Sequence, residues 1–272
     1  MLTLASASGN VFGYVWAEDA PAFFDGPRWA KVLCPRGEGF GLDGLFLVQR
    51  PTPGQPWRMD HWEPDGSLTF CSNGTRAAAA LVDTQGEQSL NSSGSEVRIR
   101  IAPGEVALRL PEGPGFDVKE NPLALDVPHA FGWTGTPHLV LDVPDTRVLD
   151  LETLAPPLRF HPDLPEGANV SFVQVLEPGR ARIRSWERGV EGETLCCGQG
   201  AAVAGAWLAQ RTGLRSWVFQ PAGADSVRVS VASMVQGVWS QLWIGGPVRR
   251  LGRVELDPSI LERLAWNVRG TC

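Results

Sequence analysis

One short pattern occurs twice in this chain, and each copy places a cysteine directly before an alanine-rich segment. The copies are residues 65–80 (DGSLTFCSNGTRAAAA) and residues 191–204 (EGETLCCGQGAAVA). Both read acidic residue, Gly, polar residue, a short apolar step, Cys71 or Cys197, two residues and Gly before the alanines. A repeated strand, cysteine and helix unit predicts two similar α/β lobes, each with a thiol at the amide-rich start of a helix.

The rest of the chain favours sheet. Short β-branched or alternating runs lie between Gly and Pro turns and predict strands. The predicted strands are 10–16, 45–49, 96–101, 106–110, 139–143, 170–175, 181–186 and 226–232. Long helices are expected only at 73–82, 198–211 and 258–266, the last with Asp257 as its N-cap. The first two are apolar nearly all round with small side chains, which indicates that sheet wraps around them.

We therefore predict an α+β fold with two pseudosymmetric lobes, each a mostly antiparallel sheet around one central helix, and a cleft between them. Residues 110–115 (LPEGPG) are the best candidate boundary. The expected lobes are 1–113 with Cys71, completed by 248–272, and 114–247 with Cys197. The role of the C-terminal extension 257–272 is left open.

Composition excludes several classes of function. A net charge of -6 and a pI near 5.3 argue against nucleic acid or an anionic membrane as a partner. No apolar run reaches the length of a membrane span and no signal peptide is apparent, so the cytoplasm is expected. Five cysteines at 34, 71, 196, 197 and 272 lack the density of a disulfide framework, and the histidines form no ligand-spaced pair, so no metal is expected.

No cofactor is expected either. Residues 39–44 (GFGLDG) match the G-x-G-x-x-G fingerprint, but the following residues 45–49 read as a strand and not as the helix that a dinucleotide site needs. A pyridoxal-phosphate enzyme needs a Schiff-base lysine, and Lys31 and Lys119 lie in no motif.

The two cysteines predict proton-transfer chemistry. A helix N-terminus can lower a thiol pKa from about 8.5, so that the thiolate becomes a base. The same helix starts offer amides at residues 73, 74, 198, 199 and 200 for a carboxylate. A single cysteine would more often be a buried apolar residue. The matched pair favours removal of a proton from one face of a carbon and return of a proton to the other, as in a racemase.

Further motifs resemble the diaminopimelate epimerase family, a family of cofactor-independent two-cysteine racemases, along nearly the whole chain. They are residues 8–12 (SGNVF), 39–45 (GFGLDGL), 65–67 (DGS), 71–76 (CSNGTR), 135–138 (GTPH), 169–170 (NV), 187–189 (ERG) and 193–200 (ETLCCGQG). The resemblance implies a cytoplasmic enzyme of lysine biosynthesis that interconverts LL- and meso-diaminopimelate without a cofactor.

The resemblance also implies roles for individual residues. Cys71 and Cys197 would be the acid/base pair, with His138 and Glu187 placed to assist their proton exchange. The implied substrate-binding residues are Asn10, Glu63, Ser72, Asn73, Gly74, Thr136, Asn169, Arg188, Gly198 and Gln199.

Some of these positions depart from the family pattern. Thr136 and Glu63 stand where the family has asparagines that hold the distal end of the substrate, and an anion at Glu63 suits a cationic distal group. One alternative is therefore a racemase of another polar or cationic amino acid. Another is a non-catalytic or redox thiol protein, in which Cys71 and Cys197 interconvert with a disulfide. The expected partner is a small amino acid, and the oligomeric state is left open, with a homodimer as one alternative.

Overall fold

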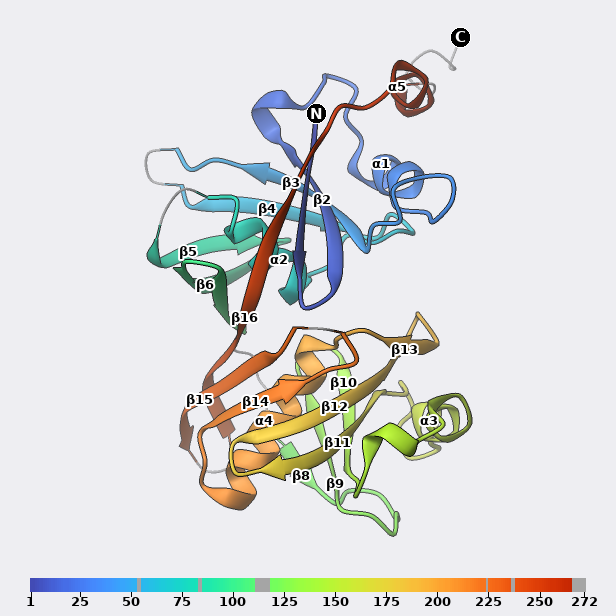
Figure 1. Ribbon diagram of the computed structural model, residues 1–272, viewed down its shortest axis with the longest axis vertical. Helices are drawn as coiled ribbons and strands as arrows, with labels where there is room; N and C mark the ends of the chain where they lie inside the picture. Colours follow the sequence, from blue (N-terminus) through green and yellow to red (C-terminus); the bar gives the residue numbers. More distant parts are fainter. Residues whose placement is uncertain (53–54, 83–84, 111–117, 224, 236–237, 266–272) are drawn as a thin grey trace. The chain divides into compact units, whose positions relative to one another are not determined.

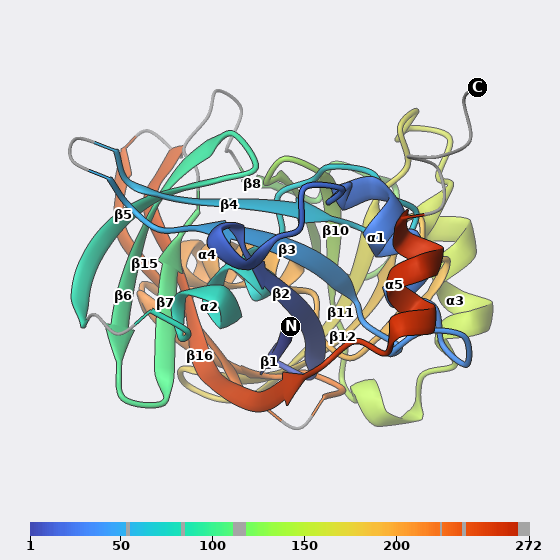
Figure 2. The ribbon, with the colours of Figure 1, turned by 90° about the horizontal axis from the view of Figure 1, so that it is seen from above.

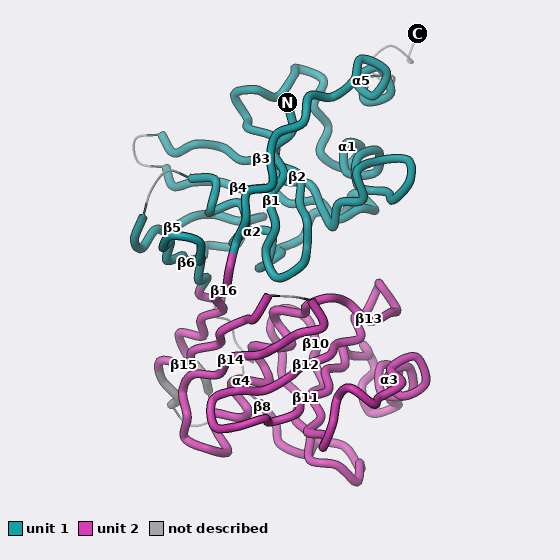
Figure 3. The backbone as a smooth tube through the Cα atoms, viewed as in Figure 1, with its two compact units in different colours: residues 1–108, 248–272 teal, residues 109–247 magenta. Residues whose placement is uncertain are grey.

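The computed structural model describes residues 1–52, 55–82, 85–110, 118–223, 225–235 and 238–265. The chain divides into two compact units, Met1–Leu108 with Val248–Cys272 and Arg109–Pro247 (Figure 3). The boundary expected after residue 113 lies outside the described residues. Both units combine helices with a sheet, as expected for an α+β fold (Figure 1).

The first unit contains most of the N-terminal half of the chain. Its elements are β1 (Leu2–Ala7), β2 (Asn10–Trp16), η1 (Ala17–Asp19), α1 (Gly26–Leu33), β3 (Gly44–Gln49), β4 (Trp57–Trp62), α2 (Ser72–Ala79), β5 (Gly86–Ser92), β6 (Ser95–Ala102), β7 (Glu105–Arg109) and α5 (Pro258–Ala265). Strand β16 (Val238–Val254) begins in the second unit and ends in the first.

The second unit repeats this alternation of strands and helices. Its elements are β8 (Val118–Glu120), β9 (His129–Trp133), β10 (Pro137–Asp142), η2 (Thr146–Val148), α3 (Leu151–Arg159), β11 (Asn169–Glu177), β12 (Arg180–Glu187), β13 (Gly192–Thr194), α4 (Gly198–Thr212), β14 (Ser216–Gln220) and β15 (Val227–Val235).

The two units share one order of strand pairing. In the first, β1–β2 is antiparallel, β2–β3 parallel, β3–β4 antiparallel, β4–β5 parallel and β5–β6 antiparallel. In the second, the pairs β9–β10, β10–β11, β11–β12, β12–β14 and β14–β15 follow the same sequence of directions. A parallel pair needs a crossover connection, and α2 and α4 lie in the second crossover of their units. The repeat seen around the cysteines therefore extends to the strand pairing.

Helices α2 and α4 are the buried helices around which the strands are arranged. All residues of α2 are buried, and the helix contacts β1, β2, β3, β4 and β6 (Figure 2). Helix α4 is buried along most of its length and contacts β8, β9, β10, β11, β14 and β15. Because most of their side chains are alanine or glycine, strands can approach them from several directions. Both helices are therefore packed against strands on several sides.

In the first unit, the peripheral helices α1 and α5 pack together against the sheet. In the first unit, Trp29 and Leu33 of α1 join Leu264 of α5 and Leu45 of β3 in one apolar cluster. Asp257 caps α5 as predicted, because its carboxylate accepts a hydrogen bond from the Ser259 amide at 2.9 Å. Among the described residues, no helix combines the length and apolar character that crossing a membrane requires.

Candidate functional site

Cys71 and Cys197 occupy the same structural position in the two units. Each is the N-cap of a buried helix and has extended backbone angles, with φ and ψ of -122° and 113° for Cys71 and -100° and 100° for Cys197. Each sulfur accepts a hydrogen bond from the amide three residues later, at 3.5 Å from Gly74 and 3.4 Å from Gly200. Both thiols therefore lie among the unpaired amides and positive dipole end of a helix.

The glycine three residues after each cysteine is required by close packing. A Cβ atom on Gly74 would lie 2.4 Å from the ring of Phe46, and one on Gly200 would lie 2.6 Å from Ser171 Oγ. Phe46 lies on β3 and Ser171 on β11, which are the equivalent strands of the two units. The spacing of cysteine and glycine thus lets the start of each helix lie directly against a strand.

A hydrogen-bonded network surrounds the start of α2. Asn73 Nδ2 donates to Asn10 Oδ1 at 2.9 Å, and Asn73 Oδ1 accepts from the Arg76 guanidinium at 2.9 Å. Arg76 is completely buried and also donates to Ser8 Oγ at 2.8 Å. Tyr14 of β2 adds a further contact, because its hydroxyl donates to the Gly74 carbonyl at 3.0 Å. The structure therefore brings Asn10 and Asn73 together in the half-site that contains Cys71.

Glu63 lies directly beyond the end of β4, in the same unit. Its carboxylate accepts a hydrogen bond from the Thr69 hydroxyl at 2.9 Å, and 40% of its side chain is exposed. His61 Nδ1 lies 3.2 Å from the same hydroxyl oxygen. Burial lowers the pKa of His61 to about 4, so its imidazole is neutral at neutral pH.

In the second unit, Glu187 lies beside Cys197. The thiol is buried, and this burial, together with the charge of Glu187 and a hydrogen bond to it, raises the pKa of Cys197 well above its ordinary value. The Gly200 amide opposes this change but is outweighed. The helix start therefore favours the Cys197 thiolate through the Gly200 amide, as expected, but the net pKa is raised because desolvation and the Glu187 charge outweigh this contribution. Glu187 also accepts a hydrogen bond of 2.5 Å from the Thr194 hydroxyl.

His138 belongs to a second network at the start of α4. Thr136 Oγ1 donates to Gln199 Oε1 at 3.1 Å and lies 3.0 Å from His138 Nε2. Burial lowers the pKa of His138 to about 4, so the ring is neutral. Its Nδ1 atom is buried with no hydrogen-bond partner among the described residues.

Asn169 connects this network with Arg188. Asn169 Nδ2 donates to Thr136 Oγ1 at 3.4 Å, and its Oδ1 accepts from the Arg188 amide at 2.7 Å. The Arg188 guanidinium donates to the Glu166 carbonyl at 3.1 Å. His138, Thr136, Asn169 and Gln199 therefore form one group.

The remaining predicted residues, Ser72 and Gly198, are the first residues of α2 and α4 and are buried. Two residues that the sequence reasoning did not single out are Thr69 and Thr194. Both lie inside the repeated pattern, shortly before the cysteine. Their hydroxyl contacts to Glu63 and Glu187 needed the structure to be found.

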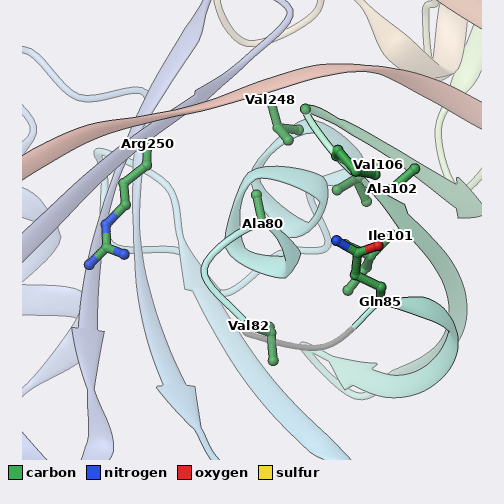
Figure 4. Close-up of a pocket in the computed structure, with 10 residues that line it drawn as sticks. Ala80, Val82, Gln85, Ile101, Ala102, Val106, Val248 and Arg250 are labelled. Carbon is green, nitrogen blue, oxygen red and sulfur yellow. The ribbon is translucent and has the colours of Figure 1, made fainter.

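A cavity of about 440 Å³ lies in the first unit, at the end of α2 opposite to Cys71 (Figure 4). Its lining is mostly apolar and includes Ala80, Val106 and Val248, with Gln85 and Arg250 as the polar members. None of the predicted site residues lines it. Within the described parts of the chain, no group of three or more His, Cys, Asp or Glu side chains could hold a metal ion.

Comparison with known proteins assigns the family. The family model for diaminopimelate epimerase matches residues 132–231. The diaminopimelate epimerase of Thermosynechococcus vestitus is 35% identical over 64% of this chain and 70% of its own length. That of Gemmatimonas aurantiaca is 31% identical over 83% of both chains. Across eight such relatives the alignments cover 66% to 83% of the relative.

A solved structure gives the same fold at greater distance. A Bacillus anthracis phenazine biosynthesis protein of the PhzF family is 16% identical and superposes with a TM-score of 0.70, covering 94% of this chain and 98% of its own. That similarity concerns the fold, whereas the closer sequence relatives concern the family. The chain belongs to the diaminopimelate epimerase family of isomerases.

Proposed function

We propose that this protein is a pyridoxal-phosphate-independent amino-acid epimerase that uses Cys71 and Cys197 as its two acid/base groups. The observation that carries the proposal is the matched pair of buried helices, each beginning at a cysteine whose sulfur accepts the amide of a close-packed glycine. In this proposal the two lobes are pseudosymmetric and present their thiols to opposite faces of one α-carbon. One thiolate removes the α-proton as the other thiol delivers a proton to the opposite face.

The helix starts would also stabilise the intermediate. When the α-proton leaves, negative charge spreads onto the substrate carboxylate, and the amides at the starts of α2 and α4 are suitable donors for it. The raised pKa of Cys197 supports a protonated thiol there in the resting protein, ready to act as the proton donor in one direction of the reaction. Glu187 and the neutral His138 would assist proton exchange in the same half-site.

Diaminopimelate is the proposed substrate, interconverted between its LL and meso forms, because the curated relatives carry that name. The alternative substrate is another polar or cationic amino acid. Asn10, Asn73, Asn169 and Arg188 would contact the substrate, with Thr136 and Gln199 in the hydrogen-bonded group that contains His138.

The test is exchange of the α-proton in deuterated water, followed by NMR with LL-diaminopimelate, lysine, ornithine and arginine. Cys71→Ala and Cys197→Ala should each lower the rate of epimerisation by about 100- to 10,000-fold, because each removes one partner of the proton transfer. Cys196→Ala is the matched control, since Cys196 is a buried neighbour that the mechanism does not use, and it should keep most of the activity. Near-normal epimerisation in either of the first two variants would refute the assignment, whereas a wild-type protein that exchanges the α-proton of none of these amino acids would favour the redox alternative.

A further inference from the structure

The strand registers define equivalent positions in the two units. In the first unit, β1 and β2 form an antiparallel pair and β3 runs parallel to β2. In the second unit, β9 and β10 form an antiparallel pair and β11 runs parallel to β10, so β3 and β11 are equivalent. Their second residues are Leu45 and Val170, and the antiparallel partners of these residues are Trp62 and Trp186. The two tryptophans therefore occupy one structural position, seen once in each unit.

The residue after each tryptophan is a glutamate. Glu63 follows Trp62, and Glu187 follows Trp186. Each carboxylate accepts a hydrogen bond from a threonine hydroxyl, Glu63 from Thr69 at 2.9 Å and Glu187 from Thr194 at 2.5 Å. The repeat therefore includes a glutamate and threonine pair in addition to the cysteine.

The two threonines are equivalent by register as well. The Thr69 amide donates to the His61 carbonyl at 3.1 Å, and Thr194 pairs with Ser185. His61 and Ser185 immediately precede the two equivalent tryptophans. The Glu63 contact is thus the first unit's copy of the contact beside Cys197, and not an incidental surface hydrogen bond.

In the second unit, the glutamate acts directly on the cysteine thiol. Glu187 acts on Cys197 through its charge and through a hydrogen bond, and both favour the protonated thiol. The threonine that orients it lies three residues before Cys197, and Thr69 lies two residues before Cys71. In both units, the threonine that holds the glutamate therefore lies shortly before the cysteine along the chain.

We propose that Glu63 is a positioning residue of Cys71, held by Thr69, in the role that Glu187 has toward Cys197. The assignment rests on the proposed two-thiol function and deepens it, since each acid/base thiol then has its own carboxylate. It replaces the interpretation of Glu63 as a residue of the distal substrate pocket. The copies differ in exposure, because the Glu63 side chain is 40% exposed and Cys71 is only partly buried, so solvent screens this pair more strongly.

Other titratable groups lie near the first half-site, and their charge states decide in which pH range the effect of Glu63 on Cys71 can be measured. The Tyr14 hydroxyl and the Arg76 guanidinium lie at the start of α2, and His61 lies beside Thr69. Burial raises the pKa of Tyr14 well above its ordinary value and lowers that of His61 to about 4. Burial, together with the charges of Glu63 and Asp43, raises the pKa of Cys34 to about 12. None of these three groups changes charge between pH 6 and 9, so a titration of Cys71 in this range is free of them.

The experiment is the pH dependence of iodoacetamide alkylation at Cys71 and Cys197, measured by mass spectrometry of the two cysteine peptides without substrate. Glu63→Gln removes a negative charge, so the inflection for Cys71 should move to lower pH by about 0.5 unit or more, with Cys197 unchanged. Glu187→Gln is the matched variant and should move Cys197 and not Cys71. Thr69→Val should move Cys71 in the same direction as Glu63→Gln, and Glu63→Asp should largely restore the wild-type profile.

Kinetics then separate positioning from substrate binding. In Glu63→Gln, kcat should fall about 10-fold or more with KM nearly constant, provided that circular dichroism shows an unchanged fold. An unchanged Cys71 inflection, or a rise in KM alone, would overturn the proposal and return Glu63 to the substrate pocket. Because alkylation needs no substrate, a wild-type protein without epimerase activity would contradict the proposed function and leave this test intact.

Discussion

Replacing Gly74 by alanine tests how closely β3 holds the start of α2. The new Cβ atom would lie 2.4 Å from both Cε2 and Cζ of Phe46 and 3.2 Å from the ring of Phe12. Phe46 is fully buried and its ring already contacts Tyr14 at a centroid distance of 5.2 Å and His61 at 4.5 Å. The ring therefore cannot withdraw unless several neighbours move with it.

The expected loss in the free energy of unfolding of Gly74→Ala is the difference between two effects. Overpacking of a well-packed core costs about 1–3 kcal/mol, and a contact of 2.4 Å with a held ring belongs at the upper end of that range. Alanine gains about 1 kcal/mol over glycine in helix propensity. Gly74→Ala should therefore lower the free energy of unfolding by about 2 kcal/mol, which corresponds to a fall in Tm of about 4–8 °C.

The assay is urea unfolding followed by tryptophan fluorescence, together with calorimetry. Gly192→Ala is the control, because the nearest atoms to its new Cβ lie 3.9 Å away and its stability should change by no more than about 0.5 kcal/mol. Gly200→Ala should cost less than Gly74→Ala, since it meets a single hydroxyl at 2.6 Å and not a ring. A Gly74→Ala protein as stable as the wild type would refute the packing argument.

Two further predictions concern pH and capping. His61 and His138 are buried with pKa values of about 4, so below about pH 6.5 the unfolded chain takes up protons that the folded protein cannot. The free energy of unfolding should therefore fall between pH 6.5 and 4, by about 1.4 kcal/mol per pH unit for each histidine. His61→Asn should make a plot of the urea midpoint against pH less steep, and an equal slope in that variant would contradict the prediction. Asp150 caps α3 through the Thr153 amide and hydroxyl, so Asp150→Ala should lower the free energy of unfolding by about 1 kcal/mol, whereas an unchanged urea midpoint would show that the cap contributes little.

Local patterns in the sequence predicted several elements well. The alanine and glycine run of α4 ends at Gly213, which has a left-handed backbone and is a favourable C-cap, so both ends of this helix can be read from the chain. Strand β2 occupies the residues 10–16 that alternation predicted. These elements follow from short-range rules of capping and periodicity, which do not depend on distant residues.

Other elements could not be predicted because distant contacts override local signals. Strand β16 continues through Gly245, Gly246 and Pro247, which read as a turn, because its ends pair with β15 and with β1. Helix α3 contains Pro156 and Pro157, which predict a break. The strands missed for the same reason are β1, β4, β5, β8, β9, β13 and β14, since their pairing partners and not their own composition place them in the sheet.

For the site, the chain by itself determined which residue types recur and at what spacing. The cysteine, two residues and a glycine before a small-residue helix suffice to place a thiol at a helix start in each unit. Only the tertiary structure decided the direction in which the pKa of Cys197 is shifted, because burial and the nearby Glu187 carboxylate outweigh the helix amides there. It also decided that Glu63 and Glu187 are equivalent, since equivalence depends on strand register, and register arises from pairing between segments far apart in the sequence.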